Sequence, residues 1–352
     1  MTVVPSPGER VFRLTEITSL STDVRRVVLN TADGAAFFYR EGQFVSVRLP
    51  DGVQRSYSPA NACGAEGRIE LHIRLLRGGH FSTWLSGADR TGSLVTLGGP
   101  YGECVWQTSV PTQAPVFMLG TGTGIAPLKA LLEKALSADG PQPITLYWGG
   151  RTLDDLYLRE HFDALARERA HFRFVPVLAE STETWQGQRG FVQDAIVAER
   201  PSLAQAMVYA CGSPLMVAGA RARLVDELGL APSRFLADAF IPAVSTIARP
   251  CEPLALTVQA HLNGKARPLA VTAGSPLMPA LAQAGLLAGV CGGQGACGTC
   301  RVRVRPSWLE RLAPPGRQEA RLLRALDSLP EHRLACQIAM STDLNGIQLD
   351  CN

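Results

Sequence analysis

The chain has 352 residues, enough for two or three domains, and its hydrophobic content of 46% supports full cores and excludes a disordered chain. The formal net charge is only +3 and no basic run alternates with aromatic residues, so nothing in the composition supports nucleic-acid binding. No stretch of about 18 apolar residues occurs, and residues 1–10 lack the apolar core of a signal peptide. We therefore expect no stable membrane insertion and a cytoplasmic, reducing location.

Residues 1–110 show short, alternating hydrophobic segments separated by glycines, a pattern typical of antiparallel strands. One helix start is indicated, at Ser82. Short strands at this spacing predict a small antiparallel β-barrel as the first domain. The expected strands cover residues 11–14, 24–29, 44–49, 69–75 and 94–97.

Two short motifs lie within this first domain. The first, Arg55-Ser-Tyr57-Ser-Pro, offers a fixed cation suited to a phosphate and a flat ring suited to stacking. The second, Gly-Gly79-His-Phe-Ser-Thr83, places two glycines before a helix N-terminus, where free amides can bind an anion. Each motif alone is weak, because Arg55 and Tyr57 are also ordinary residues for a strand and a core.

Residues 111–241 alternate strands with helices, which predicts an α/β domain with a parallel sheet. Its first strand leads into the loop Gly120-Thr-Gly-Thr-Gly124-Ile-Ala-Pro127, whose glycine amides and following helix dipole suit a pyrophosphate. The loop departs from the dinucleotide fingerprint Gly-x-Gly-x-x-Gly. The expected strands are 116–119, 144–148, 172–178 and 207–210, and the expected helices are 128–136 and 215–228.

Two further residues follow strands of this domain, at the edge where ligands gather. Cys211 is either a small buried hydrophobe or a residue beside a ligand. Arg151 could bind a 2′-phosphate, stack on adenine, or be a solvated loop residue. No acidic residue ends the strand 144–148, so the carboxylate that usually accepts hydrogen bonds from the ribose hydroxyls of NAD is missing there.

Residues 242–253 are rich in proline and small residues and are predicted to be an interdomain linker. A hairpin around Asn263-Gly264 should open the third domain, with strands over 254–260 and 267–271. The remaining expected elements are a helix over 276–287, a strand over 302–304 and a helix over 319–326.

The third domain carries the most specific motif of the chain, Cys291-Gly-Gly-Gln-Gly-Ala-Cys297-Gly-Thr-Cys300, with Cys336 further along. Four thiolates can hold a 2Fe–2S cluster, and the glycines permit the close backbone approach that this needs. A structural zinc site is the alternative, but such sites usually use two short cysteine pairs, and only Cys297/Cys300 is one. The nine cysteines, an odd number, make a disulfide framework improbable.

These motifs, in this order, resemble the ferredoxin–NADP reductase superfamily, specifically oxygenase reductases with a C-terminal 2Fe–2S ferredoxin domain. The nucleotide domain also resembles that of flavin reductases. The resemblance implies a β-barrel FAD-binding domain over 1–110 and an NAD(P)H-binding α/β domain over 111–241. After the linker, it implies an α+β (β-grasp) ferredoxin domain over 254–352.

The resemblance also implies which residues surround the flavin. Arg55 would meet its phosphate, Tyr57 would stack on its ring, and Ser58 would lie near N5. His72 and Arg74 would lie at the pyrimidine edge and the ribityl chain. The residues that would cradle the pyrophosphate are Gly79, Phe81, Ser82 and Thr83.

For the coenzyme, the resemblance places Cys211 and Gly212 beside the nicotinamide and Arg151 near the adenosine. Phe240 falls where relatives hold an aromatic ring near the flavin, although an ordinary aromatic at the end of a domain is an equal alternative. The cluster ligands would be the four cysteines of the motif. The residues that would bind the coenzyme pyrophosphate are Gly120, Thr121, Gly122, Thr123 and Gly124.

The implied activity is electron transfer from NADH, with NADPH also open, through FAD and the cluster to a Rieske or di-iron oxygenase component. Ser58 and Cys211 would be closest to the reacting atoms, and no side chain need act as a general acid or base. One alternative is a free-standing reductase of flavins, ferric chelates or quinones. Another is a redox sensor, which would not need the motifs for a hydride donor.

Overall fold

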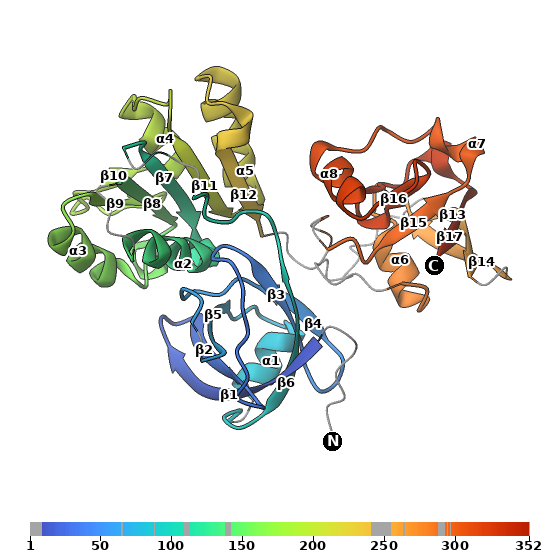
Figure 1. Cartoon of the computed structure of the whole chain (residues 1–352), viewed down its shortest axis with the longest axis horizontal. Coiled ribbons are helices and arrows are strands. Elements are labelled where there is room, and N and C mark those ends of the chain that lie inside the picture. The colour runs from blue at the N-terminus through green and yellow to red at the C-terminus, as the bar shows by residue number, and fades with distance from the viewer. Residues whose placement is uncertain are drawn as a thin grey trace. The chain divides into compact units, whose positions relative to one another are not determined.

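The computed structural model of the chain describes residues 9–64, 66–87, 89–108, 111, 113–137, 142–240, 255–262, 265–287, 293, 295 and 297–351. The chain divides into two compact units, Met1–Phe240 and Ile241–Asn352 (Figure 1). The first unit holds the two flavin-type motifs and the glycine loop, and the second holds the cysteine motif. The expected linker, the expected hairpin turn at Asn263-Gly264 and Cys291 all lie outside the described residues.

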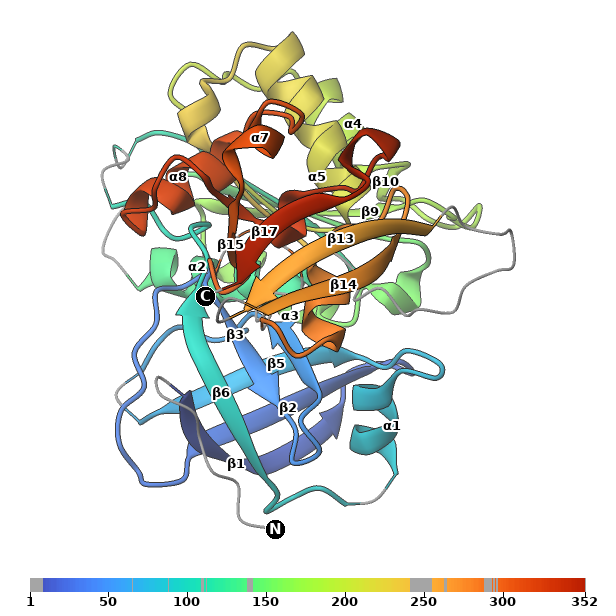
Figure 2. The ribbon, with the colours of Figure 1, turned by 90° about the vertical axis from the view of Figure 1, so that its right-hand side faces the viewer.

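The first sheet of unit 1 has six strands in the order β4-β3-β6-β1-β2-β5, and every pairing is antiparallel. An isolated antiparallel bridge joins Pro59, beyond β4, to Leu71 in β5, so it links the two edges of the sheet. Helix α1 (His80–Ser86) lies beside the sheet (Figure 2). The strands are β1 (Glu9–Ser19), β2 (Val24–Thr31), β3 (Phe44–Arg48), β4 (Gln54–Tyr57), β5 (Arg68–Arg74) and β6 (Leu94–Tyr101).

The predicted antiparallel sheet is confirmed. Successive side chains along each strand point to opposite faces of the sheet. On β5, Ile69, Leu71 and Ile73 join the core of the sheet. Glu70 and His72 alternate with them and are buried too, against the neighbouring domain of the same unit. Strand β5 is therefore buried on both faces, which the alternation of its sequence does not indicate.

The second sheet has six strands in the order β10-β9-β8-β7-β11-β12, and every pairing is parallel, as predicted. Because the strands are parallel, their carboxyl ends share one edge, where ligands of such sheets bind. The strands are β7 (Val116–Thr121), β8 (Ile144–Gly150), β9 (Phe172–Leu178), β10 (Gln188–Arg189), β11 (Met207–Gly212) and β12 (Phe235–Ala239).

Helices cover both faces of this parallel sheet (Figure 1). Helices α2 (Ile125–Leu136) and α3 (Arg159–Glu168) pack on the face that contains Met118. Helices α4 (Val192–Ala198) and α5 (Pro214–Arg221) pack on the opposite face, which contains Leu119. Adjacent strand residues thus enter different cores.

Two helices of this domain differ from expectation at their ends. Helix α2 begins at Ile125, three residues before the expected start, because Pro127 is tolerated within a first turn whose amides have no partner in the helix. Helix α5 ends at Arg221, and the π-helical segment η3 (Ala222–Glu227) completes the expected span.

The sheet of unit 2 has five strands in the order β14-β13-β17-β15-β16; only the β13–β17 pair is parallel. Strands β16 and β17 were not expected from the sequence. The strands are β13 (Ala255–Leu262), β14 (Lys265–Thr272), β15 (Arg301–Val304), β16 (His332–Leu334) and β17 (Ile347–Cys351). The helices are α6 (Met278–Gln283), α7 (Pro306–Leu309) and α8 (Arg317–Ala325).

The helix expected over 276–287 is wrong in length, since α6 covers only six residues. Gly285 adopts a φ of +68°, a left-handed conformation that ends a helix. Leu281 of α6 and Leu323 of α8 pack in one core with Val258 and Val302 of the sheet. This core supports β15, which begins directly after Cys300.

Candidate functional site

The two motifs of the antiparallel sheet meet in space. The Tyr57 ring, at the end of β4, lies with its centroid 5.1 Å from that of Phe81 in α1. Burial raises the pKa of the Tyr57 hydroxyl, so the ring stays a neutral phenol at physiological pH. Arg55 donates from Nη1 to the Gln54 carbonyl at 2.6 Å, and Ser58 is buried just beyond the strand.

The turn before α1 is compact and internally bonded. Gly78 has a φ of +71°, and a Cβ added to Gly79 would lie 3.1 Å from both the Leu76 carbonyl oxygen and Ser82 Oγ. Ser82 Oγ accepts the Leu76 amide at 2.8 Å, while Thr83 is exposed. Among the described residues, no side chain caps the N-terminus of α1, so a tight turn with little room for a Cβ leads into uncapped amides. This arrangement fits a phosphate group.

His72 and Arg74 project from β5 toward the parallel-sheet domain. His72 Nδ1 lies 3.2 Å from the Tyr157 hydroxyl, and Arg74 Nη2 lies 3.3 Å from Asp155 Oδ1. Both partners are more than 80 residues away in sequence, which is why sequence reasoning did not predict these contacts. The neighbouring domain therefore contacts one end of each side chain, while His72 Nε2 lies 3.0 Å from Glu70 Oε1 and Arg74 Nε lies 3.5 Å from Asp23 Oδ2.

The glycine loop packs directly on the end of β11. A Cβ added to Gly124 would lie 2.2 Å from the Cys211 carbonyl oxygen, so only glycine fits there. Thr121 Oγ1 accepts the Ser213 amide at 2.9 Å. Gly122 has a φ of +53°, and its carbonyl accepts the Trp148 indole N–H at 3.1 Å. The loop and the start of α2 thus fit the phosphates of a dinucleotide, as the sequence indicated.

Cys211 is fully buried, and its sulfur lies 3.9 Å from that of Cys104. The neighbouring Cys104 thiol and burial raise the pKa of Cys211, so it remains a thiol. Phe240 donates its amide to the Gly212 carbonyl at 2.7 Å, which places it beside the end of the same strand. Sequence reasoning missed Cys104, which belongs to no motif.

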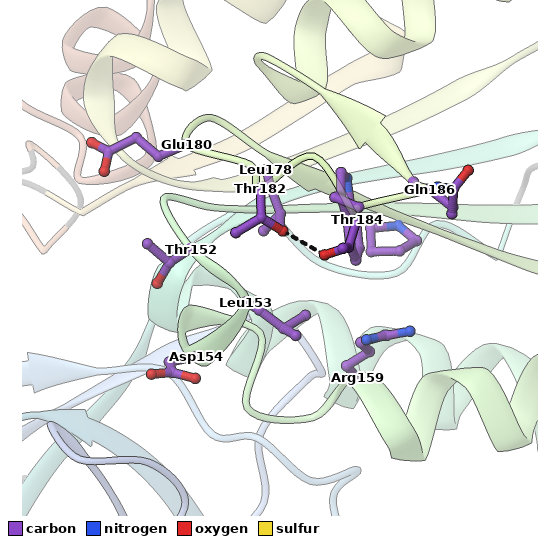
Figure 3. Close-up of a pocket in the computed structure, with 12 residues that line it drawn as sticks. Thr152, Leu153, Asp154, Arg159, Leu178, Glu180, Thr182, Thr184 and Gln186 are labelled. Atoms are coloured by element: carbon purple, nitrogen blue, oxygen red, sulfur yellow. Dashed lines mark hydrogen bonds between the residues drawn. The ribbon is translucent and has the colours of Figure 1, made fainter.

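A pocket of about 590 Å³ lies at the carboxyl edge of β8 and β9, a size usual for small-molecule sites. Figure 3 shows Leu153 and Arg159 facing Leu178 and the hydrogen-bonded Thr182 and Thr184 across it. The other residues that line it are Thr152, Asp154, Pro176, Glu180, Trp185, Gln186 and Gly187. In Figure 3, Thr152, Asp154 and Glu180 lie at one end.

Arg151 is exposed and lies one residue outside this lining set. Its amide, like that of Thr152, donates to Asp155 Oδ2, at 2.9 and 3.0 Å. Burial opposes ionisation of Asp155, but these amides and the Arg74 charge still lower its pKa. Sequence reasoning missed Glu180, although the rule that ligands gather at carboxyl ends of strands applies equally to the end of β9.

In unit 2, the structure brings Cys300 and Cys336 together, with their sulfurs 3.3 Å apart. Cys297 lies in the same loop, and its sulfur is 3.0 Å from Thr299 Oγ1. Gly298 has a φ of +71°, a left-handed conformation that favours glycine, and a Cβ there would lie 2.4 Å from Leu326 Cδ1, just beyond α8. Within the described ranges, no group of three or more His, Cys, Asp or Glu residues is arranged as a metal site, and Cys291 is not among them.

These features fit a cluster held by thiolates. Cys300 and Cys336 are close enough for both sulfurs to reach one iron, and the described cysteines form no disulfide. When bound, a 2Fe–2S cluster supplies one-electron transfer.

No helix in the described part of the chain is long and apolar enough to cross a membrane.

Comparison with known proteins agrees with this geometry. Residues 11–106 match the oxidoreductase FAD-binding domain, residues 118–222 the oxidoreductase NAD-binding domain, and residues 260–341 the 2Fe-2S iron-sulfur cluster binding domain. The protein therefore carries all three cofactor-binding domains.

Individual relatives extend the match. The chain is 32% identical over 231 residues to the CDP-6-deoxy-L-threo-D-glycero-4-hexulose-3-dehydrase reductase of Yersinia pestis, covering 66% of this chain and 68% of the relative. It is 31% identical over 230 residues to the ferredoxin–NAD(P)(+) reductase component of the naphthalene 1,2-dioxygenase/salicylate 5-hydroxylase systems of a Ralstonia species, covering 65% and 68%. The crystal structure of an Amycolatopsis cytochrome P450 reductase matches with a TM-score of 0.60 and 30% identity, covering 67% of this chain and 71% of that one. The chain belongs to the ferredoxin–NADP reductase-like family of flavin-dependent oxidoreductases, in the group that carries a 2Fe–2S domain on the same polypeptide.

Proposed function

We propose that this protein is the reductase component of a multicomponent mono- or dioxygenase, delivering electrons from NADH to a Rieske or di-iron oxygenase component. The observation that carries the proposal is the 2Fe–2S domain fused to FAD- and NAD-binding domains. A nicotinamide donates two electrons together, whereas a 2Fe–2S cluster passes them one at a time, so the fusion suits a one-electron protein acceptor. The Ralstonia and Amycolatopsis relatives, named for a dioxygenase system and for cytochrome P450, support it.

In this proposal the FAD lies along the two motifs of the antiparallel sheet. Arg55 binds the flavin phosphate, Tyr57 stacks on the ring and Ser58 lies near N5. Since the side chains of His72 and Arg74 contact the neighbouring domain, we assign their flavin contacts to main-chain atoms of β5. The pyrophosphate cradle would comprise Gly79, Phe81, Ser82 and Thr83.

The coenzyme would cross the carboxyl edge of the parallel sheet. Cys211, Gly212 and Phe240 would line the nicotinamide end, where Cys211 acts as a neutral thiol that shapes the site. The loop Gly120–Gly124 would bind the pyrophosphate, and the pocket between Leu153 and Leu178 would take the adenosine. Carboxylates at one end of that pocket can accept hydrogen bonds from a ribose diol and would repel a 2′-phosphate, which supports NADH as the preferred coenzyme.

The cluster ligands in this proposal are Cys291, Cys297, Cys300 and Cys336. The 3.3 Å separation of two of these sulfurs supports the assignment. The cluster would need a reducing compartment such as the cytoplasm for its assembly, and the free thiols of the described cysteines are consistent with one.

The finer domain description is also part of the proposal. We infer that the antiparallel sheet closes into a barrel, which the bridge between Pro59 and Leu71 supports. We assign the flavin domain to 1–110, the nucleotide domain to 111–241, the linker to 242–253 and a β-grasp ferredoxin domain to 254–352. The mixed five-stranded sheet with α6 and α8 in its core supports the last assignment.

The first test is the cofactor content of the purified full chain. We expect about one FAD, two irons and two acid-labile sulfides per chain, the composition of a 2Fe–2S flavoprotein. One zinc per chain without labile sulfide would contradict the cluster assignment.

The second test is the acceptor. NADH oxidation should be fast with cytochrome c, and substrate hydroxylation should appear only when an oxygenase component is added. Reduction of free flavin that is faster than reduction of any protein acceptor would instead support a free-standing reductase. Because the Yersinia relative is named for a sugar dehydrase, a dehydrase is the second candidate acceptor and belongs in the same assay.

A further inference from the structure

A buried charged cluster joins the antiparallel sheet to the parallel-sheet domain. At its centre is Glu70 of β5, whose Oε1 lies 3.0 Å from His72 Nε2 and 3.5 Å from Lys129 Nζ. Its Oε2 accepts Arg26 Nε at 2.8 Å. Burial opposes the charge on Glu70, but the His72 hydrogen bond and the Lys129 and Arg26 charges hold its pKa well below its usual range. Glu70 is therefore an ionised acceptor.

The state of His72 follows from its partners. An ionised carboxylate can only accept, so His72 Nε2 must carry the proton that Glu70 accepts. Burial lowers the pKa of His72 despite that hydrogen bond, so the ring is neutral at pH 7. Its Nδ1 is then an acceptor, and the hydroxyl of Tyr157, 3.2 Å away, must be the donor. Tyr157 therefore donates to His72, and His72 donates to Glu70, in one continuous row of hydrogen bonds.

The row continues to the coenzyme loop. The Tyr157 ring lies edge-on to the Trp148 ring, with centroids 5.2 Å apart and an interplanar angle of 87°. Trp148 is fully buried, and its indole N–H donates to the Gly122 carbonyl at 3.1 Å. A continuous series of contacts therefore leads from Glu70 on the flavin side to Gly122 on the coenzyme side.

A second connection anchors α2, the helix that follows the same loop. Lys129 Nζ donates to the Ala60 carbonyl at 2.8 Å and to Glu133 Oε1 at 2.7 Å. Glu133 Oε2 accepts the Ala62 amide at 2.7 Å. Ala60 and Ala62 directly follow the Arg55–Pro59 motif, so both ends of this connection belong to segments assigned to cofactors.

We propose that Glu70, His72 and Tyr157 form a positioning relay that sets the Gly122 loop, and with it the nicotinamide, at the correct distance and angle from the flavin. The inference rests on the proposed locations of FAD and coenzyme. The side chains of the three residues touch neither reactant and act through Trp148. Hydride transfer requires reacting atoms about 3–3.5 Å apart, and a misplacement of about 1 Å can cost about 100-fold in rate. A relay that controls this distance should affect the transfer rate more than coenzyme affinity.

The test is Tyr157→Phe in the full-length holoenzyme, because it removes one hydroxyl and keeps the ring. We expect the limiting rate of flavin reduction by NADH, measured by stopped flow, to fall about tenfold, while the Kd for NADH changes by less than about twofold. The kinetic isotope effect with 4-deuterated NADH should become more dependent on temperature. The long-wavelength absorbance of the coenzyme–flavin complex, which reports ring stacking without turnover, should weaken. His72→Gln, which keeps an N–H for Glu70, should retain more of the rate than His72→Leu.

The matched control is Tyr147→Phe. Tyr147 is fully buried, whereas Tyr157 is half-buried, so the control is no less demanding on packing. Tyr147 lies on the same strand as Trp148 but on its other face, and it donates to Glu199 at 2.7 Å. It should leave the rate, the absorbance and FAD content unchanged. An unaltered rate in Tyr157→Phe, or equal losses in both variants, overturns the relay. A wild-type flavin that neither NADH nor NADPH reduces would overturn the proposed function together with it.

Discussion

Gly124 shows how closely the glycine loop approaches the end of β11. The space for a Cβ is already taken by the Cys211 carbonyl oxygen, 2.2 Å away, and by Gly212 Cα, 2.6 Å away. A side chain there would have to push the glycine loop away from β11. This contact therefore sets the separation between the loop that we assign to the coenzyme pyrophosphate and the strand end that we assign to the nicotinamide.

We predict that Gly124→Ala lowers the free energy of unfolding by about 1–3 kcal/mol, the usual cost of overpacking. It should also slow flavin reduction by NADH, because the loop must move. Gly64→Ala is the control, since a Cβ at Gly64 has no neighbour within 4 Å. Thermal unfolding of both variants checks the first effect, and equal stability of the two would contradict the packing argument.

Glu180 and Arg151 would have opposite effects on the choice between NADH and NADPH. Glu180 lines the pocket, whereas Arg151 lies just outside it with an exposed side chain. A carboxylate repels a 2′-phosphate, and a guanidinium binds one through charge-assisted hydrogen bonds.

We predict that Glu180→Gln raises the ratio of kcat/KM for NADPH to that for NADH by about tenfold, equivalent to about 1.4 kcal/mol. The carboxylate that would face the extra phosphate is then neutral. Steady-state kinetics with both coenzymes measures this, and an unchanged ratio would show that Glu180 does not face the 2′ position.

Arg151→Ala tests the competing residue. If Arg151 reads a 2′-phosphate, its loss should raise the KM for NADPH about tenfold and that for NADH only a few-fold. Equal changes for the two coenzymes would assign Arg151 to the solvated loop.

At the scale of elements, one buried ion pair fastens α8 to β16 in the ferredoxin domain. Arg333 donates to both carboxylate oxygens of Glu319, at 2.9 and 3.0 Å, and Glu319 also accepts the Leu334 amide at 2.8 Å. Arg333 further donates to the Ala313 carbonyl at 2.8 Å. Because Cys336 follows two residues after Leu334, this pair also determines where that cysteine lies.

We predict that Glu319→Ala destabilises the ferredoxin domain by about 3–5 kcal/mol, because a buried guanidinium loses its counter-charge. Loss of visible cluster absorbance on heating the full chain would report the change. The double variant Glu319→Met/Arg333→Met should lose less, since no buried charge remains unpaired. A single variant as stable as the double variant would contradict this account.

At the scale of the whole molecule, the order of the carriers can be tested by interrupting it. Hydride transfer needs only the first unit, whereas one-electron delivery needs the cluster in the second. The two functions should therefore separate in a variant that lacks the cluster.

We predict that Cys300→Ser removes the cluster and abolishes reduction of a one-electron protein acceptor, while NADH still reduces the flavin at close to the wild-type rate. Stopped-flow absorbance and an acceptor assay measure the two steps. Cys351→Ser is the control, because Cys351 is buried in β17 and belongs to no ligand motif. Loss of flavin reduction in a folded Cys300→Ser protein would contradict the linear order.

The sequence by itself determined most strands and helices, and the resemblance of its motifs to a known family gave the three cofactor domains in order. The sequence also identified the glycine loop and the cysteine motif. These features depend on residue type and short-range spacing: glycines where φ is positive, alternation along a strand, thiolates a few residues apart. Gly298 is an example, since its left-handed φ is a property of one residue in a predicted loop.

Only the tertiary structure decided which surfaces meet. The contacts of His72 with Tyr157, of Cys104 with Cys211 and of Lys129 with Ala60 join residues separated by 85, 107 and 69 positions. The pocket beside Glu180 likewise forms only when the loops after β8 and β9 lie side by side. Local sequence patterns do not predict such contacts, because each side chain meets its partner only after both domains have folded and docked.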